Sequence, residues 1–281
     1  MTGLKAILVS VEYADLLAIT LPYNRHHFDD VMVVTAPKDE ATLAVAVANH
    51  CQTHVTNSFH ANGAAFNKWA ALEEALDRFN RGDKGWLCIM DADVAWPRKL
   101  VVSGNAEQCL LMDCSALSNK PKRVSTLLPG CLYGPLRRMS PMCAAVPPEE
   151  EWARLPIHRN IGEWAGYSQI FHTNDRHLGA PPWHQTDWTH AGGADSFFQA
   201  KWPDDCKRRL PFEVLHIGEA GVNWCGRATP MIDGTLVEGA EGRRKMVADL
   251  IAARVRSGRK HVDKFAAERV PKGDVPERPS V

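Results

Sequence analysis

Two aspartates separated by one residue, Asp91 and Asp93, follow a short apolar run from Trp86 to Met90. Such a run predicts a buried strand. Side chains alternate along a strand, so both carboxylates can point to the same side where the backbone leaves the sheet. Neighbouring carboxylates repel each other unless a cation lies between them, and hard divalent cations with oxygen ligands also bind phosphates. The pattern indicates a metal site, and an acidic turn after a strand is the alternative.

Later residues can complete such a site. His216 lies near the end of an expected strand at 212–218 and is a candidate metal ligand, and one imidazole among oxygens suits Mn²⁺. A structural histidine is the alternative. Asp195 opens an expected helix after two glycines, where a carboxylate can act as a general base or simply complement the helix dipole. Arg137 and Arg138, between glycine and proline residues, can bind diphosphate or DNA phosphate, or form a plain surface pair.

The elements before Asp91 alternate between strands and helices. Apolar, β-branched runs predict strands, and apolar residues three and four positions apart predict helices. The expected strands are 5–11, 30–35, 53–56 and 86–90, and the expected helices are 13–21, 40–50 and 64–79. This order predicts an α/β fold with a parallel sheet and right-handed crossovers, whose ligands sit at the carboxyl ends of the strands.

The second half is less regular. Residues 100–163 are rich in proline and are expected to be irregular, whereas 166–172 is expected to be an aromatic strand. From Gly242 to Val281, eleven lysines and arginines stand against five acids, and a helix is expected over 241–267. The chain therefore divides into a domain at 1–240 and a basic helical extension with a frayed tail at 241–281. The extension is either a solvated helix or a surface for a polyanion.

Composition sets broad limits. The 281 residues include 33 basic and 33 acidic side chains, which argues against a protein that coats nucleic acid non-specifically. The sequence shows neither a membrane-spanning apolar run nor a signal-peptide pattern, and its eight cysteines suit reduced thiols. These features predict a cytoplasmic protein, in the host cytoplasm if it is phage-encoded, with no membrane insertion.

The order of these features over residues 5–227 resembles the GT-A glycosyltransferases. Ala64–Lys68 is also similar to the Asn/Lys-containing helix start of family-2-type members. The resemblance implies a GT-A-like, Rossmann-type, mostly parallel sheet flanked by helices. It implies that Asp93 ligates Mn²⁺ or Mg²⁺, that Asp91 contacts the donor's ribose or a metal-bound water, and that His216 completes the metal site. Asp195 would then be the base of an inverting enzyme.

Three donor-side segments sharpen the resemblance: Tyr13–Leu17, Leu21–Asp29 and Val33–Asp39. They look like small phage and bacterial transferases, among them the phage TET-associated DNA glycosyltransferases. This resemblance implies a 5-hydroxymethylpyrimidine in phage DNA, 5-hydroxymethylcytosine first, as the acceptor. Four residues would line the donor pocket, with solvated charges as the alternative: Asp15, Thr35, Asp39 and Lys68.

Other residues give weaker signals. Aromatic faces stack on sugars or extruded bases, so three tryptophans are acceptor-site candidates, although tryptophan is usually a core residue: Trp183, Trp188 and Trp224. Four cysteines could form a zinc site, but their spacing is not that of paired knuckles and buried thiols are favoured: Cys109, Cys114, Cys131 and Cys143. His184 and His190 are weaker metal-ligand candidates.

The sequence thus predicts the transfer of a hexose from a nucleotide sugar, first a UDP-hexose, to a hydroxyl. Alternatives are a glycan or cell-surface polysaccharide transferase, a nucleotidyltransferase, and a binding module whose acids are structural. A nucleotidyltransferase would usually carry a glycine-rich loop after its first strand, and Ser10–Tyr13 contains no glycine. The sequence does not indicate the oligomeric state.

Overall fold

The computed structural model describes residues 3–79, 84–104, 109–113, 122–158, 164 and 166–256. Its N-terminal part alternates strands and helices as predicted: β1 (Leu4–Val9), α1 (Ala14–Asn24), β2 (Asp30–Thr35), α2 (Glu40–Ala48), β3 (Gln52–Val55), α3 (Lys68–Phe79) and β4 (Trp86–Asp91). The four strands lie in the order β3-β2-β1-β4, and each neighbouring pair is parallel. The predicted α/β class with a parallel sheet is confirmed.

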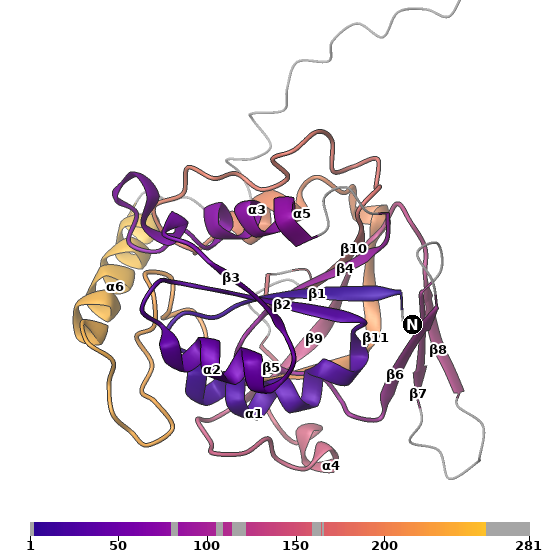
Figure 1. The fold of residues 1–281 in the computed structure, drawn as a ribbon, viewed down its shortest axis with the longest axis horizontal. Coiled ribbons are helices and arrows are strands. Elements are labelled where there is room, and N and C mark those ends of the chain that lie inside the picture. The colour runs from indigo at the N-terminus through magenta and orange to yellow at the C-terminus, as the bar shows by residue number, and fades with distance from the viewer. Residues whose placement is uncertain are drawn as a thin grey trace, which may run out of the picture.

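Alternate residues of β1 enter two separate cores. Ala6 and Leu8 belong to the apolar cluster that contains side chains of α1 and α2. Ile7 and Val9 belong to the cluster that contains side chains of α3 and of the short helix α5 (Ala194–Gln199). Figure 1 shows the result, with α1 and α2 on one side of the sheet and α3 and α5 on the other. The sheet is therefore buried on both faces, as parallel sheets require.

Beyond β4 the same sheet is mixed. β10 (Ser168–His172) runs antiparallel to both β4 and β9 (Leu132–Ser140). β9 runs parallel to β11 (Lys207–Ile217), and β11 pairs antiparallel with the two-residue strand β5 (Val94–Ala95). Because β5 directly follows the turn that carries Asp93, this last pairing brings two distant parts of the chain to one edge.

The prediction that residues 100–163 are irregular is wrong. β6 (Leu100–Gly104), β7 (Cys109–Asp113) and β8 (Lys122–Leu127) form a small antiparallel sheet, and the helix α4 (Glu149–Trp152) follows β9. In β9 and β11, prolines interrupt the strand pattern. Pro135 lies inside β9, and Pro211 lies in β11 where the register between the two strands shifts. A proline cannot donate to the ladder and is placed at edges and bulges, so it counts against a strand in the sequence.

The helix expected from Ala64 begins at Lys68 instead. Ser58–Gly63 forms a 3₁₀ turn, as do Arg25–His27 and Asp204–Cys206 elsewhere in the chain. The Asn67 side chain then accepts a hydrogen bond from Ala70 N at 3.0 Å, which makes it the N-cap of α3. The cap therefore places Lys68 at the first residue of the helix.

The basic C-terminal helix α6 spans Ala240–Arg256. The rest of the predicted helix and the tail beyond it lie outside the described residues. In Figure 1, α6 and the small sheet β6-β7-β8 lie at opposite sides of the view. Among the described residues, none of the helices has the length and apolar character needed to cross a bilayer.

One buried histidine should make stability depend on pH. The His27 ring is fully buried and lies 3.9 Å from the His26 ring and 5.4 Å from the Trp96 ring, measured between centroids. Burial, and after it the His26 ring, lowers the pKa of His27 to about 3. The unfolded chain, with a histidine pKa of about 6.5, binds the proton first, so stability should be lost as the pH falls from about 6.5 towards 3.

The measurement is the free energy of unfolding in urea at several pH values. His27→Gln should reduce the slope of this free energy against pH by up to about 1.4 kcal/mol per pH unit. The slope is compared, rather than the stability at one pH, because the substitution also alters packing. An unchanged slope would show that the His27 ring is protonated equally in both states.

Candidate active site

A cavity of about 540 Å³ opens at the carboxyl ends of β1 and β4. Val9, the last residue of β1, is in register with Asp91, the last residue of β4, so both strands end at the same edge. Six of the residues assigned from the sequence to catalysis or to donor or metal binding line this cavity: Lys68, Asp91, Asp93, Arg137, Asp195 and His216. They come from five elements and the β4–β5 turn, so the fold brings together residues up to 148 positions apart in the chain.

Sheet pairing places Asp93 beside His216. Val94 of β5 is in register with His216 of β11, and Ile217 N donates to Asp93 O at 2.9 Å. The nearest side-chain atoms, Oδ2 of Asp93 and Nε2 of His216, are 3.4 Å apart, and both residues are buried. Within the described part of the chain, Oδ1 of Asp93 and Nδ1 of His216 have no hydrogen-bond partner. Each of these two neighbouring residues thus has one buried polar atom without a partner among the described residues.

The pKa values of Asp93 and His216 are both shifted by burial. Burial, and then the negative charge of Asp91, raises the pKa of Asp93 to about 7. Burial, and then the positive charge of Arg137, lowers the pKa of His216 to about 3. His216 is therefore a neutral imidazole at neutral pH, which is the form that binds metals.

Asp91 is bound by a lysine. Lys68 Nζ forms an ion pair with Asp91 Oδ1 and donates to Gly166 O at 3.2 Å. Burial opposes the charge on the amine, but Asp91 and Asp195 outweigh it, and the pKa of Lys68 is raised. Asp91 therefore already has a cationic partner. The described residues contain no ready-made cluster of three His, Cys, Asp or Glu side chains that could hold a metal ion. Asp93 and His216 form an incomplete site, which water or phosphate oxygens would have to complete.

Arg137 is a buried cation with free donors. Its guanidinium lies 4.4 Å from the centroid of the Tyr167 ring, whose hydroxyl donates to Pro135 O at 2.6 Å. Among the described residues, Nε and Nη2 of Arg137 have no partner. Burial lowers the pKa of this arginine. Because Arg137 lines the cavity, its guanidinium is a candidate anion site. The adjacent Arg138 does not line the cavity and donates twice to Glu213, at 2.7 and 2.8 Å.

Asp195 is fixed in the cavity wall by a backbone amide. Gly166 N donates to its Oδ2 at 2.9 Å, and a Cβ atom on Gly166 would lie 2.9 Å from the carboxylate carbon. Only glycine allows this approach. Burial raises the pKa of Asp195, against the effect of the Lys68 charge. A carboxylate with a raised pKa is a better proton acceptor.

Three predicted donor-pocket residues do not line the cavity. Asp39 is the N-cap of α2: its Oδ1 accepts from Thr42 N at 3.2 Å, and its Oδ2 accepts from the Thr35 hydroxyl at 3.0 Å. Asp15 forms a two-point ion pair with Arg227. The cap could have been read from the sequence, because an aspartate directly before a helix is a typical N-cap.

Of the three tryptophans, Trp224 lines the cavity, whereas Trp183 and Trp188 pack in or against the core beneath α3. The described residues hold no cysteine or histidine cluster suited to a metal, and Cys114 lies outside them. His184 instead has its Nδ1 2.6 Å from Oε1 of the buried Glu73. The weak zinc hypothesis therefore gains no support from the described residues.

The sequence did not single out several residues of the cavity wall. Tyr13, Tyr167 and Arg227 line it, and so does Gly192, on which the Trp224 indole lies. Tyr13 also lies against the Arg227 guanidinium, at 4.7 Å from its ring centroid. No motif marks these positions, because their roles come from contacts between segments more than 30 residues apart.

No family model and no curated protein matches this sequence. Among solved structures, the chain is similar to mannosyl-3-phosphoglycerate synthase from Rubrobacter xylanophilus, with 12% identity over 95% of this chain and 78% of that chain and a TM-score of 0.44. It is similar to glucosyl-3-phosphoglycerate synthase from Mycobacterium tuberculosis in complex with Mn²⁺ and uridine-diphosphate-glucose, with 12% identity over 89% and 78% and a TM-score of 0.41.

A further structure of the Mycobacterium tuberculosis enzyme also contains phosphoglyceric acid. It is matched at 16% identity over 32% of this chain, with a TM-score of 0.24. In that match the chain spans about a third of the other protein's length, 33%. The identities and TM-scores are too low for residue roles or a substrate to be carried over.

The contact between Gly192 and Trp224 gives a test of the cavity wall. A Cβ atom on Gly192 would lie 2.7 Å from both Cγ and Cε3 of Trp224, so Gly192→Ala should displace the indole. We expect a loss of stability of about 1–3 kcal/mol and a shift in tryptophan emission. The control is Gly85→Ala, because a Cβ atom there would meet nothing within 4 Å. Equal effects of the two substitutions on urea unfolding and fluorescence would contradict the prediction.

Proposed function

We propose that this protein is a metal-dependent glycosyltransferase that moves a hexose from a nucleotide sugar to an acceptor hydroxyl. The observation that carries the proposal is that three residues lining one cavity have buried polar atoms without partners among the described residues: Oδ1 of Asp93, Nδ1 of His216, and Nε and Nη2 of Arg137. Such atoms cost free energy until a ligand supplies their partners. A divalent cation suits the carboxylate and imidazole, and a diphosphate suits the guanidinium.

Asp93 and His216 would hold Mn²⁺ or Mg²⁺, with Asp91 contacting the ion, its water or the donor's ribose. The residues fit such an ion because a buried carboxylate oxygen and a neutral imidazole stand side by side with open coordination positions. When bound, the ion offsets negative charge on the departing diphosphate. The Lys68 ammonium, which bridges Asp91 and Gly166 O, holds Asp91 at the edge of this site.

Arg137 would bind the diphosphate. Its side chain is pinned over the Tyr167 ring, so its free N–H groups need no reorganisation when an anion arrives. Donors held in place in this way stabilise charge that develops during the reaction better than flexible ones. A nucleoside diphosphate sugar fits this arrangement, and a UDP-hexose is the first donor to test.

Asp195 would be the general base of an inverting reaction. The acceptor oxygen forms its bond to the anomeric carbon while the bond from that carbon to the diphosphate oxygen breaks. The bonding electrons leave with the diphosphate, and the hydroxyl proton passes to Asp195. The hydrogen bond from Gly166 N fixes the carboxylate for this step, and burial keeps its pKa above the usual value.

The leading acceptor is 5-hydroxymethylcytosine in phage DNA, and a glycan is the alternative. Trp224 lines the cavity and offers a ring that can stack on a base or on a sugar. The charged lining is balanced, with four cations (Lys68, Arg137, Lys207 and Arg227) and four anions (Asp91, Asp93, Asp195 and Glu219). The cavity therefore favours neither acceptor by charge, and the basic helix α6 beside it is the feature that suits DNA.

The donor site is tested by calorimetric titration of UDP. The wild-type protein should bind UDP with Mn²⁺ present and lose that binding in EDTA. Asp93→Ala should weaken it by about 100-fold or more, because a buried member of the charged site is removed. Arg137→Ala should weaken it by about 30-fold, whereas the adjacent Arg138→Ala, whose guanidinium pairs with Glu213 outside the cavity, should leave Kd unchanged.

The same titration with GDP tests whether the donor carries guanine instead of uracil. Failure of both nucleotides to bind the wild-type protein with Mn²⁺ would overturn the proposed function. Equal binding with and without EDTA would overturn the metal role alone.

The transfer step is tested with Asp195→Asn. This variant should keep the UDP affinity of the wild type but lower kcat for transfer by about 10²–10⁴-fold, because only the proton acceptor is lost. Transfer is measured to a duplex that contains 5-hydroxymethylcytosine, to the same duplex with cytosine, and to a set of oligosaccharides. Transfer to oligosaccharides alone would replace the DNA acceptor by a glycan. Retention of the anomeric configuration would remove the base role from Asp195.

A further inference from the structure

The turn after β1 forms one wall of the cavity. Val9, Val11 and Tyr13 line the cavity from this turn. Glu12, between the last two, has φ 63°, the left-handed conformation that a non-glycine residue adopts at a cost of about 1–2 kcal/mol. Such a conformation persists only where neighbouring groups enforce it. The position of Tyr13 therefore depends on what holds Glu12.

Bonds from three directions hold Glu12. Its N–H donates to Asp39 Oδ2 at 2.7 Å, and its carbonyl oxygen accepts from Arg227 Nη1 at 2.6 Å. Its carboxylate forms a two-point ion pair with Arg243 of α6. Two of these three anchors are arginines from the part of the chain after β11.

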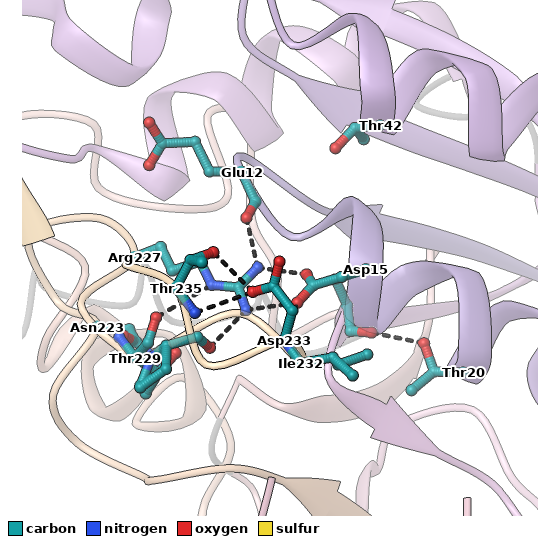
Figure 2. Close-up of polar contacts among 12 residues, drawn as sticks. Glu12, Asp15, Thr20, Thr42, Asn223, Arg227, Thr229, Ile232, Asp233 and Thr235 are labelled. Atoms are coloured by element: carbon teal, nitrogen blue, oxygen red, sulfur yellow. Dashed lines mark hydrogen bonds and ion pairs between the residues drawn. The ribbon is translucent and has the colours of Figure 1, made fainter. Parts of the chain in front are cut away.

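Arg227 is the centre of this network (Figure 2). The residue is fully buried, and all five N–H groups of its guanidinium are used. Besides Glu12 O, they reach both carboxylate oxygens of Asp15 and the carbonyl oxygens of Thr229, at 3.3 Å, and Pro230, at 2.8 Å. One face of the guanidinium lies against the Tyr13 ring, at 4.7 Å from the centroid. Arg227 thus joins the β1–α1 turn, the start of α1 and the segment after β11.

Arg243 extends the network to the C-terminal helix. Besides Glu12, its Nη1 donates to Arg227 O at 3.1 Å, and its side chain passes 3.3 Å from where a Cβ atom on Gly226 would stand. Gly226 has φ 101° and is itself in the cavity wall. Helix α6 is therefore in direct contact with the groups that support the wall.

We propose that Arg227 and Arg243 are positioning residues for the donor: they hold the β1–α1 turn, and with it Tyr13, in the shape that receives the nucleoside part of a nucleotide. This inference rests on the proposed function, because it assigns a role to the wall of the same site. It also makes α6 part of the donor site, in contrast to the separate extension expected from the sequence.

The test uses one substitution at a partly exposed residue and one conservative substitution at a buried residue. Arg243→Ala removes a partly exposed guanidinium. Arg227→Ala would leave Asp15 without its buried partner, so Arg227→Lys is made instead. We expect Arg243→Ala to raise Kd for UDP with Mn²⁺ by roughly tenfold, since a small displacement of a binding wall is costly. Arg227→Lys keeps the positive charge but loses the two-point hydrogen bonding of the guanidinium. It should raise Kd for UDP at least as much as Arg243→Ala does.

Two comparisons separate positioning from mere stabilisation. Arg138→Ala is the matched control, because it removes the same kind of two-point pair, with Glu213, from outside the cavity. Glu12→Gln combined with Arg243→Ala forms a double-mutant cycle, and the double variant should bind UDP no worse than Arg243→Ala alone. Equal changes in Kd for Arg138→Ala and Arg243→Ala, or additive effects in the cycle, would overturn the inference.

A measurement without nucleotide distinguishes failure of this inference from failure of the proposed function. Amide hydrogen exchange in residues 10–15 of the free protein should speed up in Arg243→Ala and remain unchanged in Arg138→Ala. If the wild type binds neither UDP nor GDP, the proposed function and the donor role fail together, and exchange shows whether the arginines hold the turn. If the wild type binds UDP and exchange in the turn is unchanged in Arg243→Ala, the inference alone is overturned.

Discussion

The pairing of β5 with β11 is the constraint on which the site depends. β5 has only two residues, yet its register with Leu215 and His216 fixes where the β4–β5 turn lies. Asp93 is in that turn, so its carboxylate comes to the imidazole of His216 without any direct attraction between them being needed. The sheet's hydrogen bonds supply the free energy that keeps two groups in a buried position that is unfavourable for both.

The three aspartates that line the cavity differ in the partners that offset their charge. Asp91 forms an ion pair with Lys68, and Asp195 accepts a hydrogen bond from the backbone amide of Gly166. Of the three, only Asp93 has a buried carboxylate oxygen without a partner among the described residues, and burial, then the charge of Asp91, raises its pKa to about 7. The divalent cation of the proposed function would supply the missing partner and offset the negative charge.

The sequence predicts the parts of this arrangement that are local. An apolar strand followed by two acids, a strand with a histidine near its end, and an acid after two glycines are visible in short windows, and the fold brings all three to one cavity. The strands between residues 100 and 140 were not predicted: β9 contains Pro135 and pairs with the distant β11, and β6, β7 and β8 contain no proline but depend on pairing with one another. Asp15 and Asp39 were assigned to the donor pocket by resemblance, but one pairs with Arg227 and the other caps α2. The cap could have been predicted from the position of Asp39 directly before a helix, whereas the partner of Asp15 lies 212 residues away and is not visible in sequence spacing.

The two walls of the cavity differ in how they are held, and this has a consequence for specificity. The wall with Asp91, Asp93 and His216 follows from sheet register, and a change of register would move every side chain to the other face. The wall with Tyr13 depends on side-chain contacts of Arg227 and Arg243, which single substitutions can alter without disturbing a strand. Under the proposed function, metal binding would thus be tied to the fold, whereas contacts to the nucleoside could change independently. Reactivity and donor recognition would be separable, because backbone pairing fixes the wall of the first and side-chain pairs fix the wall of the second.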